Sequence, residues 1–254
     1  MTRIILSGCM GKMGRVVHSL VDSDPAYEIA AGVDIASSTS GFTFPVYPSI
    51  TVCEMPADAV IDFSGISSIP GLLEFGVKRQ VPLVICTTGL TDGMKSDVLE
   101  ASGEVAIFQS ANMSLGINLI ENMVKKAAKL LYGSHFDIEI IEKHHNQKID
   151  APSGTALLLA DSINGALGGQ LEYVYNRNEV RRKRSRNELG LHSLRGGTIV
   201  GDHSVVFAGI DETIELSHTA LSKEIFAVGA IKAAAFIKDK GPGMYTMQDL
   251  IEEL

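Results

Sequence analysis

The segment 142–155, EKHHNQKIDAPSGT, gathers residue types that transfer protons and bind anions. His144 can donate or accept a proton near neutral pH, and Lys148 supplies a positive charge four residues later. The small residues Ser153–Thr155 follow a proline and predict the start of a helix, whose free N–H groups suit a carboxylate. The segment therefore indicates a pocket that holds an anion and delivers a proton.

Two other interpretations of this segment remain open. His144 and His145 are adjacent and can ligate a metal, but no third ligand has the spacing to complete a site, so we expect no metal. The stretch 150–155, DAPSGT, can be no more than a turn and a helix cap. A cap, however, gives no reason for two histidines and Lys148 at the end of a predicted strand.

A second group of residues indicates a dinucleotide site. The apolar run 3–7 predicts a strand, and the stretch 8–14, GCMGKMG, leads from it into a helical pattern. Glycines let backbone N–H groups approach a pyrophosphate at a helix N-terminus. The spacing is GxxGxxG and not GxGxxG, so a tight turn that needs glycine for packing is an equally consistent interpretation.

Asp34, at the end of a second predicted strand, supports the dinucleotide interpretation. An acid at this position can accept hydrogen bonds from an adenosine ribose, although a surface turn carboxylate is the alternative. Its charge repels a 2′-phosphate, and the residues 35–40, IASSTS, offer no base to compensate. We therefore expect NADH to be preferred, while Lys12 and Arg15 keep NADPH open as a cofactor.

The pattern of elements predicts an α/β chain with two domains. Apolar runs alternate with helical patterns up to residue 112, which predicts a Rossmann-like parallel sheet. A second α+β domain with a mixed, mostly antiparallel sheet follows, and a final helix is expected at 224–241. We predict a dinucleotide-binding domain at 1–112, completed by 221–254, and a substrate-binding and oligomerisation domain at 113–220. Strands are expected at 3–7, 28–34, 58–64, 82–89, 105–112, 136–145, 197–209 and 212–220.

Composition excludes several classes of protein. The 254-residue chain has a net charge of -8, which argues against general affinity for nucleic acid. Cys9, Cys53 and Cys86 are scattered, as in a reducing compartment. No signal peptide and no apolar run of about 18 residues is evident, so we expect a cytoplasmic protein without a membrane segment. The basic run 181–186, RRKRSR, is either a solvated loop or an anion patch near the substrate entrance.

Several motifs in order resemble one enzyme family. They are GCMGKMG, CTTG, SANMSLGIN, EKHHNQKIDAPSGTA, LRGGTIVGDHSVVFAG and ETIELSHTA. The sequence resembles the 4-hydroxy-tetrahydrodipicolinate reductase (dihydrodipicolinate reductase) family of the diaminopimelate–lysine pathway, over nearly its whole length. The resemblance implies an NAD(P)H-dependent reduction of a cyclic dicarboxylic imine, with hydride to ring C4, loss of the 4-hydroxyl as water and protonation of the neighbouring ring carbon. It also implies a homotetramer built through the sheets of the second domain.

The resemblance also implies roles for individual residues. His144 and Lys148 would transfer protons, and His145 would contact the substrate. The expected carboxylate site is formed by Ser153, Gly154 and Thr155. The expected cofactor-binding residues are Gly8, Cys9, Met10, Gly11, Lys12, Met13, Asp34, Cys86, Thr87, Thr88, Ser110, Ala111, Asn112 and Met113.

The sequence departs from the family at two positions, and two other functions are open to a chain of this kind. Cys86 stands where many relatives have glycine, and Lys223 stands where arginine is common, so a bidentate contact would be lost there. An inactive NAD(P)-binding regulator or assembly factor of the same fold is the alternative, but His144, Lys148 and Ser153–Thr155 are all intact. A semialdehyde or homoserine dehydrogenase would need its own substrate residues, and no catalytic-cysteine pattern is present.

Overall fold

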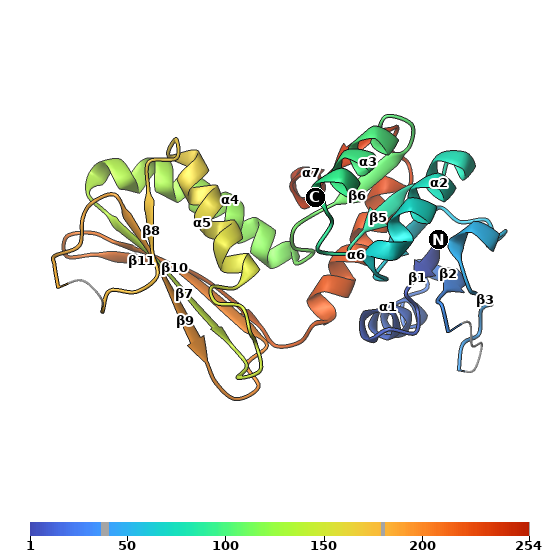
Figure 1. Ribbon diagram of the computed structural model, residues 1–254, viewed down its shortest axis with the longest axis horizontal. Coiled ribbons are helices and arrows are strands. Elements are labelled where there is room, and N and C mark those ends of the chain that lie inside the picture. The colour runs from blue at the N-terminus through green and yellow to red at the C-terminus, as the bar shows by residue number, and fades with distance from the viewer. Residues whose placement is uncertain (37–40, 179–180, 254) are drawn as a thin grey trace. The chain divides into compact units, whose positions relative to one another are not determined.

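The computed structural model describes residues 1–36, 41–178 and 181–253. The chain forms two compact units, one made of Met1–Leu115 with Glu224–Leu254 and the other of Gly116–Lys223 (Figure 1). Each unit has a sheet and a hydrophobic core of its own. Within the described residues, no helix is long and apolar enough to cross a membrane.

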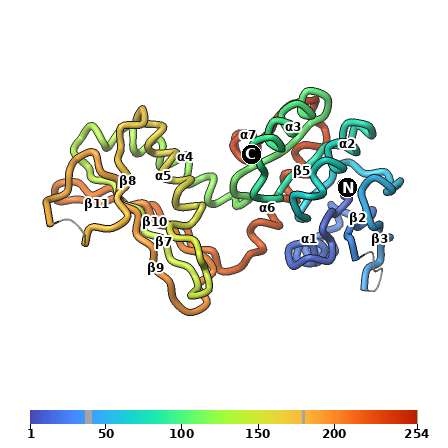
Figure 2. Tube along the Cα trace, in the orientation of Figure 1, coloured from blue at the N-terminus to red at the C-terminus, as the bar shows by residue number. Residues whose placement is uncertain are grey.

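The first unit is built on a parallel sheet of seven strands, in the order β12-β6-β5-β4-β1-β2-β3. This arrangement confirms the predicted Rossmann-like domain. Figure 2 shows the chain's last segment returning to this unit, where β12 pairs in parallel with β6. The strands are β1 Thr2–Ser7, β2 Tyr27–Val33, β3 Val46–Tyr47, β4 Ala59–Asp62, β5 Leu83–Ile85, β6 Ala106–Gln109 and β12 Gly243–Tyr245. The helices are α1 Lys12–Asp22, α2 Ile69–Arg79, α3 Asp92–Ser102, α6 Glu224–Ile237 and α7 Met247–Glu253.

Successive side chains of a strand point to opposite faces of the sheet, so this unit has one hydrophobic cluster on each face. On β1, Ile4 and Leu6 pack with α1, α6 and α7, whereas Ile5 packs with α2 and α3. Both faces are covered, which explains why these strands are continuous apolar runs. The carboxyl ends of the strands consequently meet at one edge, where ligands bind in folds of this type.

The second unit has a mixed five-stranded sheet in the order β11-β10-β7-β9-β8. The mixed sheet was predicted, but β9 was not, and it adds two parallel pairings. β10 pairs antiparallel with β7 and β11, while β9 runs parallel to both β7 and β8. Two of the four described strand pairings are antiparallel and two are parallel, as in the predicted mixed sheet. The elements are α4 Leu115–Leu131, β7 Asp137–His144, α5 Gly154–Ala166, β8 Glu172–Val174, β9 Glu188–Arg195, β10 Gly201–Ala208 and β11 Thr213–Ala220.

One face of this sheet is covered by α4 and α5, as Figure 1 shows. Ile140, Leu191 and Phe207 point to this face and are almost completely buried against both helices. The opposite face carries Ile141, which is 37% exposed, and Leu194, which is 48% exposed. At one end of the helix-covered face the apolar residues give way to polar ones, and the residues of segment 142–155 lie there.

Candidate active site

The glycine-rich stretch turns sharply between β1 and α1. Gly8 has a positive φ of 79°, and a Cβ there would lie 2.7 Å from the carbonyl oxygen of Phe63. A Cβ on Gly14 would lie 2.2 Å from the carbonyl oxygen of Gly8. Packing alone therefore requires glycine at both positions. Gly11 is the N-cap of α1 and makes no side-chain capping bond, so the first-turn N–H groups suit an anionic ligand.

Asp34 is attached directly to this turn. Its Oδ2 accepts a hydrogen bond from the Met10 backbone N–H at 3.0 Å, and its Oδ1 accepts one from Ala36 N–H at 3.2 Å. The carboxylate therefore lies at the carboxyl end of β2, beside the turn. The stretch 35–40 was expected to offer no basic side chain that compensates the charge of Asp34. Positions 37–40 of that stretch lie outside the described residues.

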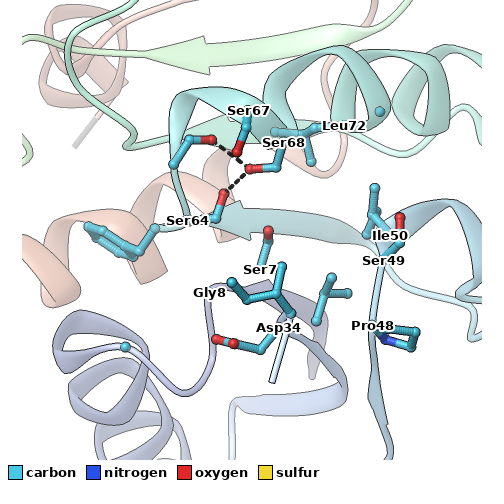
Figure 3. A pocket seen from close by; sticks show the side chains of 16 residues that line it. Ser7, Gly8, Asp34, Pro48, Ser49, Ile50, Ser64, Ser67, Ser68 and Leu72 are labelled. Carbon is cyan, nitrogen blue, oxygen red and sulfur yellow. Dashed lines mark hydrogen bonds between the residues drawn. The ribbon is translucent and has the colours of Figure 1, made fainter. Parts of the chain in front are cut away.

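A cavity of about 530 Å³ opens beside Asp34 (Figure 3). It lies over the carboxyl ends of β1, β2 and β4. From β1 the sheet continues to β2 on one side and to β4 on the other, so the chain switches direction across the sheet at this point. Its walls are mainly backbone and small polar or apolar side chains, including Gly8, Gly11, Asp34, Ile35, Pro48, Ser49, Ile50, Phe63, Ser64, Ser67, Ser68 and Leu72. This is the position at which dinucleotides bind in doubly wound folds.

The sequence prediction missed the polar group at the end of β4. Asp62 is fully buried, and its Oδ2 accepts a hydrogen bond from the Thr87 hydroxyl at 2.6 Å. The Ser64 hydroxyl donates to the other carboxylate oxygen and contacts Ser68 at 2.5 Å, as Figure 3 shows for the two serines. Asp62 and Ser64 lie in the predicted strand 58–64, at the carboxyl end where ligands bind in folds of this type, so their position could have been found from the sequence.

Side chains at the other expected cofactor positions are used in packing. Cys9 is fully buried, and burial raises the pKa of its thiol to about 11. Burial, assisted by the charge of Asp62, also raises the pKa of the Cys86 thiol well above its usual range. Met113 is buried under α6, where Gly229 lies against its carbonyl oxygen. At Cys9 and Met113 the backbone is therefore the group that can face a cofactor, whereas the Cys86 side chain is partly exposed.

The remaining expected cofactor residues lie around the same sheet edge. Lys12 and Met13 are in the first turn of α1, with Lys12 exposed and Met13 partly buried. Thr88 follows β5. Ser110, Ala111 and Asn112 follow β6, and Asn112 Oδ1 accepts a hydrogen bond from Ser114 N–H at 2.8 Å.

In the second unit, Glu142 is the centre of a hydrogen-bond network at the end of β7. Its side chain is 1% exposed, and its two carboxylate oxygens lie 2.7 Å from the two terminal nitrogens of Arg195. His144 Nδ1 lies 2.6 Å from Oε2, and Ser153 N–H donates to Oε1 at 3.1 Å. Burial alone would raise the pKa of Glu142, but hydrogen bonds from Arg195, His144 and Ser193 lower it to about 2.

His144 is buried against a second histidine. The rings of His144 and His203 are 5.1 Å apart in an edge-to-face arrangement. His203 Nε2 lies 2.9 Å from the Ser153 hydroxyl, which also caps α5 by accepting from Ala156 N–H. Burial and the neighbouring His144 lower the pKa of His203 to about 4, so it is neutral at physiological pH.

The structure thus brings most of the segment 142–155 together. Lys148 Nζ forms an ion pair with Asp150 at 2.9 Å, and Ser153 lies beside His203. His145 is partly exposed at the end of β7, and its carbonyl oxygen accepts a hydrogen bond from Lys148 N–H. Gly154 and Thr155 begin α5, so they lie at the positive end of its dipole. Among the described residues, no group of three or more His, Cys, Asp or Glu has the arrangement of a metal site.

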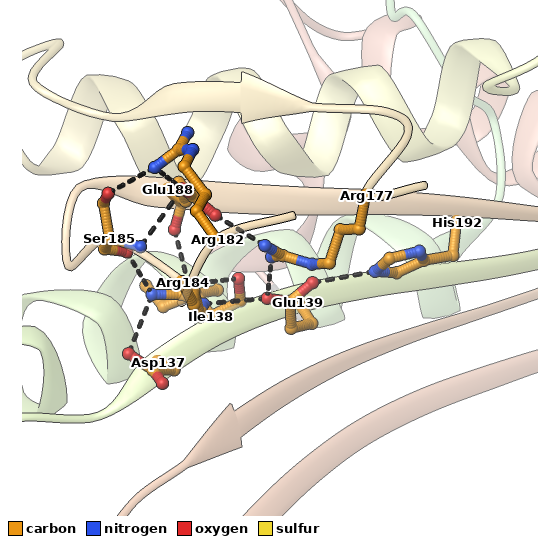
Figure 4. A network of polar contacts seen from close by, with 9 residues as sticks. All are labelled: Asp137, Ile138, Glu139, Arg177, Arg182, Arg184, Ser185, Glu188 and His192. Atoms are coloured by element: carbon orange, nitrogen blue, oxygen red, sulfur yellow. Dashed lines mark hydrogen bonds and ion pairs between the residues drawn. The ribbon is translucent and has the colours of Figure 1, made fainter. Parts of the chain in front are cut away.

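Part of the basic run 181–186 is neutralised within the unit (Figure 4). Arg182 pairs with Glu188 at 2.9 Å, and Arg184 pairs with Glu139 at 2.9 Å. Glu188 is 2% exposed and also pairs with Arg177, which together with the Ser185 N–H lowers its pKa to about 2. Arg182 and Arg184 are therefore tied to carboxylates of β9 and β7, and the Arg184 side chain is largely buried while that of Arg182 stays 51% exposed.

Comparison with known proteins decides the family. Residues 2–113 match the family profile of the dihydrodipicolinate reductase N-terminus, and residues 116–251 match that of the dihydrodipicolinate reductase C-terminus. The chain belongs to the dihydrodipicolinate reductase family. The resemblance that the motifs indicated is confirmed, and the two profiles cover nearly the whole reductase chain.

Individual relatives cover the chain equally completely. The 4-hydroxy-tetrahydrodipicolinate reductase of Caldanaerobacter subterraneus subsp. tengcongensis is 52% identical over 253 residues, which are 100% of this chain and 99% of the relative. That of Clostridium tetani is 51% identical, over 99% of this chain and 97% of the relative. Membership of this oxidoreductase family therefore rests on full-length similarity.

Solved structures share the fold. Dipicolinate-bound dihydrodipicolinate reductase from Paenisporosarcina sp. TG-14 gives a TM-score of 0.81 at 23% identity, over 97% of both chains. A myo-inositol dehydrogenase from Corynebacterium glutamicum gives a TM-score of 0.56 at 15% identity, over 99% of this chain and 93% of the other. The two-unit architecture of this reductase family is thus also found in other dehydrogenases.

Proposed function

We propose that the protein is an active 4-hydroxy-tetrahydrodipicolinate reductase of diaminopimelate and lysine biosynthesis. It would reduce 4-hydroxy-tetrahydrodipicolinate to tetrahydrodipicolinate with NADH or NADPH as the hydride donor. The observation that carries this proposal is the contact of His144 Nδ1 with the buried carboxylate of Glu142, next to the start of α5. A proton donor and an anion site are thereby held within a single unit.

Glu142 determines which nitrogen of His144 reacts. With a pKa of about 2 the carboxylate is ionised and can only accept a hydrogen bond, so Nδ1 carries the hydrogen. Nε2 is then the atom that gives up or takes a proton. We assign to it, together with Lys148 Nζ, the proton delivered to the ring carbon beside C4.

The substrate's carboxylates match the cationic groups of the same unit. The N-terminus of α5, at Gly154 and Thr155, offers N–H groups and a positive dipole end. Lys148 adds a full charge, and His145 lies three residues before it. Ser153 contributes differently, because its N–H donates to Glu142 and its hydroxyl caps the helix, so it shapes the pocket.

The cavity beside Asp34 fits an adenosine dinucleotide. When bound, NADH or NADPH supplies the hydride for C4. The α1 N-terminus suits the pyrophosphate, and Asp34 suits the ribose hydroxyls, since each of its oxygens accepts one backbone hydrogen bond and retains a further lone pair. A negative charge here disfavours a 2′-phosphate, so we propose that NADH is preferred.

We further propose a homotetramer assembled through the uncovered face of the five-stranded sheet. That face carries Ile141 and Leu194, both more than a third exposed, while α4 and α5 occupy the other face. A sheet that is half covered and carries apolar residues on its open side is typical of a subunit contact.

The function is tested by oxidation of NADH, followed optically, with the product of the preceding synthase as the substrate. We expect turnover by the wild type, and a sharp loss of kcat in His144→Ala and Lys148→Ala with little change in NADH affinity. Absence of turnover in a wild type that binds NADH would favour the inactive-regulator alternative. Unchanged kcat in one variant would remove that residue from proton transfer.

A further inference from the structure

Arg195 connects two parts of the segment 142–155 from a different strand. It ends β9, where the parallel register places it beside His144. Its two terminal nitrogens contact both oxygens of Glu142 at 2.7 Å, and one of them also donates to the Asp150 carbonyl oxygen at 2.7 Å. A planar guanidinium can make these three contacts at once, whereas a lysine ammonium lacks the fork geometry.

The first contact fixes His144. A carboxylate that is 1% exposed would be costly to ionise without a paired charge, and Arg195 supplies that charge. The ionised Glu142 then fixes both the ring orientation of His144 and its Nδ1–H tautomer. Nε2 points toward Gly201, where a Cβ would come within 3.0 Å of it, so glycine leaves this nitrogen uncrowded.

The second contact fixes Lys148. The Asp150 carbonyl oxygen is held by Arg195, and the Asp150 carboxylate pairs with Lys148 Nζ at 2.9 Å. A hydrogen bond from Lys148, helped by the positive charges of Lys148 and Arg195, lowers the pKa of Asp150, so the pair is ionic. The backbone of this turn, and with it the starting position of Lys148, thus depends on the same guanidinium.

We propose that Arg195 is a positioning residue that organises both proton donors, His144 through Glu142 and Lys148 through Asp150. The inference rests on the proposed reductase function for its kinetic meaning. Arg195 contacts no reacting atom itself. From a neighbouring strand it keeps His144 and Lys148, two groups of one segment, in a single arrangement, which is the condition for efficient proton delivery.

The kinetic test compares Arg195→Lys with Arg3→Lys. Arg3 makes a similar two-nitrogen contact with Asp58 in the other unit and serves as the matched control. We expect Arg195→Lys to lower kcat about 10- to 100-fold, with KM for NADH within about twofold of wild type. Arg3→Lys should keep wild-type kcat. Wild-type kcat in Arg195→Lys would overturn the proposal.

A second measurement needs no turnover and separates this proposal from the proposed function. In protein labelled with ¹⁵N-histidine, the His144 signals are assigned by their loss in His144→Gln. We expect the Nδ1–H tautomer in the wild type and a mixture of tautomers in Glu142→Gln and Arg195→Lys. A predominant Nε2–H tautomer in the wild type, or an unchanged tautomer in both variants, would refute the positioning role. A wild type with the expected tautomer but no NADH oxidation would refute only the reductase activity.

Discussion

The buried carboxylate of Glu142 makes a specific prediction about stability in acid. Its pKa falls from an ordinary 4.5 to about 2 because of hydrogen bonds from Arg195, His144 and Ser193, which outweigh the opposing effect of burial. A lowered folded-state pKa contributes stability that is complete above pH 4.5 and is lost as pH falls toward 2. At about 1.4 kcal/mol per pH unit, this difference corresponds to at most about 3 kcal/mol in the free energy of unfolding.

The substitution Glu142→Gln isolates this contribution because glutamine does not titrate. Urea unfolding followed by circular dichroism, repeated from about pH 5 down to about pH 2, gives the free energy of unfolding at each pH. We expect the wild type to lose its advantage over Glu142→Gln by about 3 kcal/mol across this range. Other carboxylates titrate in both proteins and cancel in the difference.

The control is Glu74→Gln, which removes an exposed carboxylate from α2 and should follow the wild type at every pH. If the wild type and Glu142→Gln lose stability in parallel, with a difference that changes by less than about 1 kcal/mol, the ionised state of Glu142 is refuted. The assignment of Nδ1–H to His144 would then lose its basis.

Three further predictions concern the cofactor, the core and the assembly. Asp34→Asn should lower the ratio of the Kd for NADPH to the Kd for NADH about tenfold, measured by fluorescence titration; a wild type that prefers NADPH would contradict the reasoning. Phe207→Ala, at a fully buried position, should cost about 3–5 kcal/mol in urea unfolding, and a loss below about 1 kcal/mol would show that the site repacks. Ile141→Glu should dissociate the oligomer in sedimentation, while Leu99→Glu, at an exposed position of α3, should not; a tetramer that stays intact in Ile141→Glu would exclude the open sheet face as the subunit contact.

The sequence predicted the parts of the fold that have strong local patterns. The central strands of the first unit are continuous apolar runs, and the strongly apolar helix α6 is followed within a few residues by Gly241 and Pro242. The strand β9 was missed because ELGLHSLR contains a glycine and an irregular alternation. The strands β3, β8 and β12 span only two or three residues, which is too short for a periodicity to be evident.

The site was predictable where its residues are neighbours in sequence. His144, Lys148 and Ser153 lie within a single segment, so their chemistry could be inferred together. Arg195 is 53 residues from Glu142, and only the register of the unpredicted strand β9 brings them into contact. In the sequence Glu142 cannot be distinguished from an ordinary surface acid. Its burial depends on the pairing of β7 with β9.

The discontinuous first unit has a consequence for synthesis on the ribosome. Ala230, Ala234 and Ile237 of α6 are buried in the same core as Ile4 and Leu6 of β1. The nascent chain cannot complete this core until residues near 237 have left the exit tunnel, whereas the unit at 116–223 is contiguous and can close earlier. Strand β1 is synthesised long before α6, so its apolar side chains stay without these packing partners for most of synthesis. We therefore expect a holdase chaperone to bind the β1 region of the nascent chain.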